Sequence, residues 1–111
     1  MGQHSVRVIF KYGMDDWDPA FELEQELMDA VEASGKGEFD GNEIAMDGST
    51  VEFFMFGPDA DALFEVVRPI LEMSPIVKDG VATLRYGSYD EDARESVVKV
   101  GFRSGSYLGN C

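Results

Sequence analysis

The stretch Asp47–Phe56, DGSTVEFFMF, decides the fold that this sequence predicts. Its first two residues, Asp47 and Gly48, are typical of the tight turn of a β-hairpin. After the turn, both sets of alternate positions are apolar. Val51, Phe53 and Met55 form one set, and Phe54 and Phe56 belong to the other. A strand that is apolar on both faces normally lies in the interior of a sheet. The stretch therefore predicts a hairpin whose second strand is central.

Four further segments have the apolar and polar alternation expected of strands. They are Glu38–Met46, the first arm of the hairpin, and Val6–Tyr12, Val81–Tyr86 and Val97–Phe102. Within the hairpin arm, Phe39 lies on the opposite parity from Ile44 and Met46. We expect a bulge at Gly41 to reconcile the two halves, because an isolated glycine in a strand often marks one.

Two helices are predicted between these strands. Asp18 followed by Pro19 is a helix-start signal with Asp18 as the N-cap, and Gly35 supplies the stop. The apolar stripe of this helix recurs every four residues, and its other face is acidic. Asp59 is the expected cap of the second helix, which contains Pro69 and should kink there before it ends near Ser74 and Pro75.

Strand, helix, hairpin, helix and strand in this order predict an α+β fold, the ferredoxin-like βαββαβ sandwich. Right-handed crossovers give an antiparallel sheet of order 4-1-3-2 with both helices on one face. A fifth, C-terminal strand is expected beside the fourth; alternatively it bends across the open face. Residues 1–111 are expected to form a single domain with a core over about 5–102 and a loose C-terminal tail over 103–111.

The composition argues against several partners and locations. Nine Lys and Arg residues stand against twenty-two Asp and Glu residues, a net charge of −13. Nucleic acids and anionic membranes attract clustered basic residues, so neither is an expected partner. No apolar stretch approaches the roughly 18–20 residues of a membrane span. Cys111 is the only cysteine, which excludes an intramolecular disulfide and fits a cytoplasmic location.

The predicted topology gathers several acidic loop residues at one end of the sheet. The loop after the first strand, the hairpin turn and the entry to the fourth strand share that end, and they carry Asp15, Asp16, Trp17, Asp47 and Asp79. Asp15, Asp16, Asp47 and Asp79 are candidate ligands for a hard cation. Trp17, Asp15 and Asp16 are candidates for binding a protein partner. The competing interpretation is structural, with the aspartates in caps and turns and Trp17 packed on the helix.

Motifs for other chemistry fail on spacing or charge. An EF-hand loop beginning at Asp40 would have its glycine second and Val51 twelfth, which does not fit. Val100–Arg103 resembles part of the acylphosphatase signature, but in that family the phosphate-binding loop follows the first strand, where this chain is acidic. His4 is the sole histidine, and neither a phosphate loop nor a serine elbow is found. No catalytic residue, cofactor or enzymatic activity is therefore expected.

Phe54 and Phe56 lie where sheet-based RNA-binding domains stack bases, but the acidic charge and the missing Lys/Arg-Gly-Phe signature disfavour RNA. We expect the fifth strand or a second subunit to cover these rings.

Gly37–Asn42 (GEFDGN) and Gly57–Pro75, with its internal Pro69, resemble small bacterial proteins of ferredoxin-like fold. The resemblance covers roughly residues 6–87, and it implies a fold but no catalytic residues. The sequence favours a non-catalytic protein-interaction or regulatory module, with a homodimer through the open sheet face as one form. The alternatives are a small-ligand sensor of ACT-like type and a minimal enzyme or divalent-metal binder that uses the acidic loops.

Overall fold

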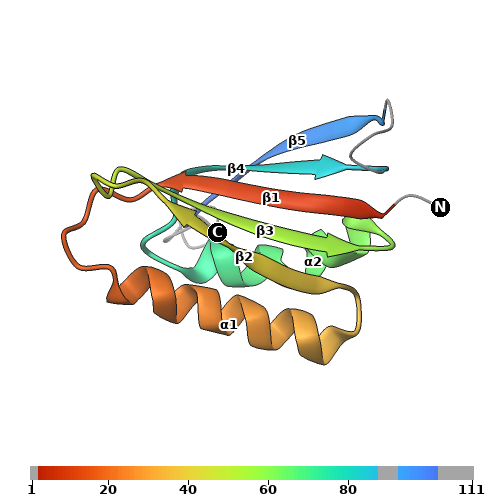
Figure 1. The fold of residues 1–111 in the computed structure, drawn as a ribbon, viewed down its shortest axis with the longest axis horizontal. Coiled ribbons are helices and arrows are strands. Elements are labelled where there is room, and N and C mark those ends of the chain that lie inside the picture. The colour runs from red at the N-terminus through yellow and green to blue at the C-terminus, as the bar shows by residue number, and fades with distance from the viewer. Residues whose placement is uncertain (1–2, 88–92, 103–111) are drawn as a thin grey trace, which may run out of the picture.

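The computed structural model describes residues 3–87 and 93–102 as one antiparallel sheet with two helices (Figure 1). The order of the strands across the sheet is β2-β3-β1-β4-β5. Figure 1 shows both helices on the same side of the sheet. The elements in chain order are β1 (His4–Lys11), α1 (Asp18–Ser34), β2 (Glu38–Ile44), β3 (Thr50–Gly57), α2 (Ala60–Met73), β4 (Lys78–Arg85) and β5 (Glu95–Val100).

This topology confirms the strand order expected from the sequence. Strands one to four lie in the order 4-1-3-2, and β3 is an interior strand, as its two apolar faces predict. The fifth strand pairs antiparallel with β4 in unbroken register from Gly80↔Val100 to Arg85↔Glu95. The alternative in which the fifth strand crosses the open face is therefore wrong. The tail predicted over 103–111 lies outside the described residues.

The core lies between the sheet and the two helices. Alternate residues of β1 and β3 point into it, and they meet the apolar stripes of α1 and α2. The largest fully buried side chains are Phe10, Phe53, Leu27, Met55, Leu63 and Leu71. Among the described residues no polar or charged residue is fully buried, so this core is held together by apolar packing.

The start of α1 differs by one residue from the sequence prediction. Trp17, rather than Asp18, is the N-cap residue, and no side chain caps the helix there. The reason is a local turn, in which the carboxylate of Asp16 accepts a hydrogen bond from the Asp18 amide at 3.0 Å. Asp18 thus enters the first helical turn, where a carboxylate interacts favourably with the helix dipole.

The predicted cap of α2, the end of α1 and the bulge in β2 are confirmed, whereas the bounds of the strands differ from the predicted ones by up to three residues. Asp59 caps α2 by accepting hydrogen bonds from the amides of Asp61 and Ala62. Gly35 ends α1 in the left-handed conformation, at φ 69°. The register between β2 and β3 shifts between Phe39 and Gly41, which is the expected bulge. Pro69 lies inside α2, which runs on to Met73.

Candidate functional site

The face of the sheet opposite the helices is covered by no described element (Figure 1). Because side chains alternate along a strand, every second residue of each strand points to this open face. The pairing registers place its residues in rows, which run from β2 at one edge to β5 at the other. We call this surface the open face; its apolar residues are Ile9 on β1, Phe54 and Phe56 on β3, Val81 on β4 and Val97 on β5.

Large apolar side chains of the open face are exposed to solvent. Ile9 is 37% exposed, Phe56 36% and Val97 68%. Phe54 and Val81 are half-buried beside them. A hollow of about 360 Å³ lies over the same strands, and its walls include Arg7, Phe54, Phe56, Thr83, Arg85 and Glu95. Large apolar side chains exposed together with polar groups on one face can mark an interaction site.

Ion pairs neutralise much of the charge of the open face. The Arg7 guanidinium lies 3.1 Å from the Glu52 carboxylate, Arg85 lies 3.1 Å from Glu95, and Lys11 lies 3.3 Å from Asp79. Such exposed pairs contribute little to stability, about 0–1 kcal/mol each. As a consequence, the open face has little net charge, although the whole chain carries a net charge of −13.

The predicted acidic end is assembled by the backbone. The Tyr12 amide donates to the Ser49 carbonyl at 2.8 Å, and the Gly13 amide donates to the Gly48 carbonyl at 2.7 Å. These bonds join the loop after β1 to the hairpin turn between β2 and β3. The gathering of these two loops, which the topology predicted, is thus observed.

The carboxylates at this end nevertheless have separate local roles. Asp16 binds the Asp18 amide, Asp47 accepts from the Ser49 amide at 2.9 Å, and Asp79 pairs with Lys11. Asp15 is exposed. Nowhere in residues 3–87 and 93–102 do three Asp, Glu, His or Cys side chains converge as a metal-ligand set.

Trp17, the candidate partner-binding residue, lies beside this turn. It is 37% exposed and packs edge-to-face against Phe21, with 6.5 Å between the ring centroids. The indole nitrogen also lies close to Gly48 of the hairpin. Trp17 therefore links the start of α1 to the hairpin and leaves about a third of its surface to solvent.

The Asp47 carboxylate is stabilised in its charged form by the hairpin turn. Hydrogen bonds from the side chain and backbone of Ser49 hold the pKa of Asp47 below its ordinary value. A depressed pKa adds stability above the ordinary range of an aspartate, and this contribution is lost as the pH falls. Asp47 thus has a structural function in the turn.

Tyr12 lies at the base of the same end. Its hydroxyl donates to the Asp16 carbonyl at 2.5 Å, and the residue is 3% exposed. Burial raises the pKa of Tyr12, and the nearby carboxylates of Asp16 and Asp18 add to that rise, while a hydrogen bond with the Ala20 backbone opposes it.

The raised pKa of Tyr12 predicts a loss of stability in alkaline solution. Below about pH 10 the phenol is neutral in both states; above it the unfolded chain ionises first, so the free energy of unfolding falls. We expect the stability advantage of the wild type over Tyr12→Phe to shrink as the pH rises through this range. Urea denaturation of both proteins across that range measures it, and a constant difference would contradict the assignment.

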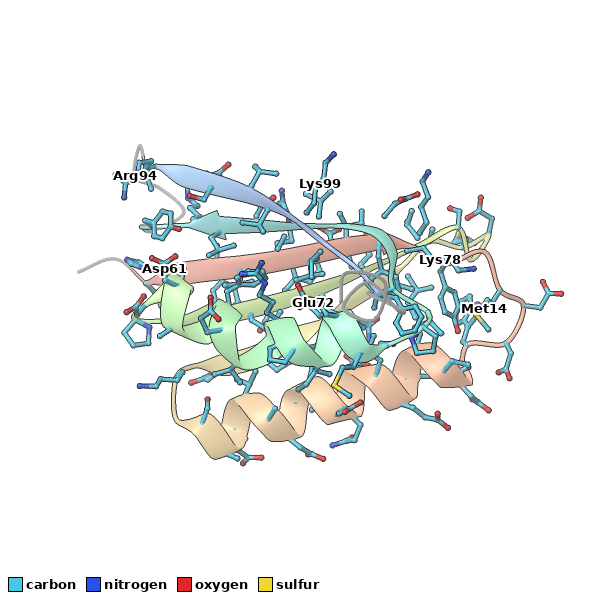
Figure 2. The ribbon with its side chains drawn as sticks, turned by 180° about the vertical axis from the view of Figure 1, so that it is seen from behind. Met14, Asp61, Glu72, Lys78, Arg94 and Lys99 are labelled. Atoms are coloured by element: carbon cyan, nitrogen blue, oxygen red, sulfur yellow. The ribbon has the colours of Figure 1, made fainter. Side chains whose placement is uncertain are left out.

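A polar cluster that the sequence did not reveal lies at the opposite end of the sheet. The Tyr86 hydroxyl donates to the Asp61 carboxylate at 2.7 Å and lies 3.2 Å from the Ser96 hydroxyl oxygen. His4 Nδ1 accepts the Ala60 amide at 3.0 Å. His4 also packs edge-to-face on Tyr86, and Figure 2 shows Asp61 and Arg94 at this end.

This cluster joins the start of α2 to β1, to the residue after β4 and to β5. His4 Nδ1 is occupied by a backbone amide, so that nitrogen serves to hold the start of α2. Only the pairing of β4 with β5 brings Tyr86 to Ser96, which is why sequence spacing gave no signal. We interpret the role of this cluster as structural, because it holds the start of α2 against the sheet.

Another hollow, of about 790 Å³, is lined by the start of β4 and the end of β5, with Pro75, Val77–Val81 and Lys99–Phe102. Among the described residues that line it there is no histidine or cysteine, and the one carboxylate, Asp79, is paired with Lys11. In the described part of the chain no helix is long and apolar enough to cross a membrane.

No family model, curated protein or solved structure matches this chain. The open face is therefore the best candidate for a functional surface.

Proposed function

We propose that this chain is a non-catalytic protein-interaction module of ferredoxin-like βαββαβ order, extended by β5, and that it acts through its open face. One observation supports the proposal most strongly: among the described residues, no helix or strand covers one whole face of the five-stranded sheet. Sheets in folded domains normally bury one face against helices and often leave the other polar. Here the uncovered face presents Ile9, Phe56 and Val97 among its charged side chains.

The partner that fits this surface is a second copy of the chain. The open face carries Arg7, Lys11, Arg85 and Lys99 against Glu38, Glu43, Glu52, Asp79 and Glu95, which is close to neutral. Helix α1, in contrast, carries six carboxylates and no basic residue. Two copies of charge −13 repel least when they meet through their least acidic surface.

The area of the open face is sufficient for a dimer. Strands of six to eight residues rise about 3.3 Å per residue and lie about 4.8 Å apart, so five strands give a face of roughly 24 by 23 Å. Two such faces bury about 1,100 Å² in total, which exceeds the ~1,000 Å² expected of a specific interface. The interface then contains both the exposed apolar side chains and ion pairs, and the Arg7–Glu52 pair lies near its centre, because Arg7 is on the middle strand.

A charge placed on the open face tests this proposal. Ile9 lies on β1, the middle strand, and is already partly exposed, so Ile9→Glu should fold but should not dimerise. Met46→Glu is the matched control, because Met46 is 97% exposed on the hairpin turn and the added charge is the same.

Sedimentation velocity measures the outcome against the monomer mass of 12.3 kDa. We expect the wild type and Met46→Glu at about twice this mass and Ile9→Glu at the monomer mass. A wild type that sediments as a monomer at every concentration tested would refute the proposal, as would an Ile9→Glu protein that remains dimeric. Circular dichroism of each variant establishes that it is folded.

A further inference from the structure

The two edges of the open face differ in charge, because β2 carries only carboxylates there, whereas β5 carries Lys99 and a Glu95 that is paired with Arg85. Glu38 and Glu43 point to this face from β2, and Lys99 points to it from β5. Figure 2 shows Lys99 on the side of the sheet away from the helices. Within residues 3–87 and 93–102 none of these three side chains forms an ion pair. Each edge therefore has a charge available for a partner.

These charges are aligned across the sheet. The registers pair Lys99 with Val81, Val81 with Ile9, Ile9 with Glu52, and Glu52 with Glu43. Lys99 and Glu43 are thus the two ends of a single row. Ile9 is the middle of that row, because β1 is the third of the five strands.

We infer that two copies pack face to face about a two-fold axis parallel to β1; this inference rests on the proposed self-association. Rotation about such an axis places each row of one copy opposite the same row of the other copy, and it places the β2 edge opposite the partner's β5 edge. Lys99 of one copy then faces the partner's Glu43, and the symmetric contact forms at the other edge. Ile9 lies beside the axis and packs against the partner's Ile9.

This arrangement also places like charges opposite each other, but at least one member of each such contact is already paired within its own copy. Arg7 lies near the axis, opposite the partner's Arg7, but each is already paired with Glu52 of its own copy at 3.1 Å. Glu95 faces the partner's Glu38 and is paired with Arg85 at 3.1 Å. Arg85 lies opposite the partner's Phe56, where a guanidinium and an aromatic ring attract each other.

An axis perpendicular to the strands gives a poorer match. It places β2 on the partner's β2 and so brings two unpaired carboxylates from each copy together, Glu38 and Glu43. It also places Lys99 opposite the partner's Glu95, but that carboxylate is already paired with Arg85. No basic residue of β2 or β3 lies beside them to neutralise the charge. Like charges across an interface oppose that orientation, and charges at the rim select the orientation in which they are complementary.

Zero-length cross-linking distinguishes the two axes. A carbodiimide joins a lysine amine directly to a carboxylate, and an equal mixture of isotope-labelled and unlabelled chains identifies links between copies by mass spectrometry. Within one chain Lys99 and Glu43 lie at opposite edges of the sheet, four strand spacings or about 19 Å apart, too far for a direct amide bond. We expect a mixed-isotope Lys99–Glu43 link. Met46→Glu should give the same link, and Ile9→Glu should abolish it.

A charge exchange gives an independent measurement. Lys99→Glu and Glu43→Lys should each raise the dimer dissociation constant about five-fold, since two exposed contacts are lost, and the double variant should return it toward the wild type. A mixed-isotope link from Lys99 to the partner's Glu95, or single variants that the double variant does not rescue, would overturn the axis. If the dimer still forms and still requires Ile9, only the axis is wrong; if the wild type is monomeric, the proposed function fails as well.

Discussion

Replacement of Phe53 by alanine should lower the free energy of unfolding by about 3–5 kcal/mol, the range for a buried phenylalanine. Phe53 is 1% exposed on an interior strand. Its ring lies 5.8 Å from that of Phe10 and 5.6 Å from that of Phe39, between centroids. Truncation therefore leaves a cavity between three strands, which a rigid sheet cannot close by a local shift.

Phe21→Ala is the matched control for this substitution. Phe21 lies on α1, is 45% exposed and contacts Trp17 at its edge, so its truncation should cost less than about 1 kcal/mol. Urea denaturation of the three proteins at one fixed concentration measures both effects. Equal losses for Phe53→Ala and Phe21→Ala would contradict the burial that the fold assigns to β3.

Gly37→Ala should be the second most damaging of the substitutions considered. The segment between α1 and β2 crosses the end of β3 here, and a Cβ on Gly37 would overlap the carbonyl oxygen of Phe56. On the other side of the crossing, a Cβ on Gly57 would overlap the carbonyl oxygen of Lys36. Since both obstacles are backbone atoms, the strands must separate, and overpacking of this kind costs about 1–3 kcal/mol.

Lys36→Ala is the control at this crossing. Lys36 is exposed and precedes Gly37 in the chain, so its truncation should change the free energy of unfolding by less than about 0.5 kcal/mol. Amide hydrogen exchange adds a structural readout, because Gly37→Ala should weaken protection where Glu38 pairs with Phe56. Normal protection there, together with unchanged stability, would refute the close approach of the two segments.

The strand order followed from the sequence because its signals were local and agreed with one another. The two apolar parities of Val51–Phe56 placed β3 in the interior, and the glycine at position 41 marked the bulge in β2. The N-cap of α1 is Trp17 and not Asp18, because a turn in which Asp16 accepts the Asp18 amide brings Asp18 into the first helical turn, and residue spacing does not show this turn.

The functional surface was less accessible to sequence reasoning. The loops of the acidic end were predicted to meet, and they do, but the roles of Asp47 and Asp79 depend on hydrogen bonds and pairs that spacing does not show. The alignment of Lys99 with Glu43 depends on four strand registers in succession. A one-residue slip in any strand would send its side chains to the other face, so the alignment requires the three-dimensional structure.

Isotope-filtered NOE spectroscopy on a mixture of labelled and unlabelled chains tests the central claim most directly, because it reports only contacts between copies. The open-face dimer predicts intermolecular NOEs from the side chains of Ile9, Phe54, Val81 and Val97. Intermolecular NOEs confined to the exposed side chains of α1, Phe21 and Met28, would contradict it, as would the absence of any intermolecular NOE at millimolar concentration.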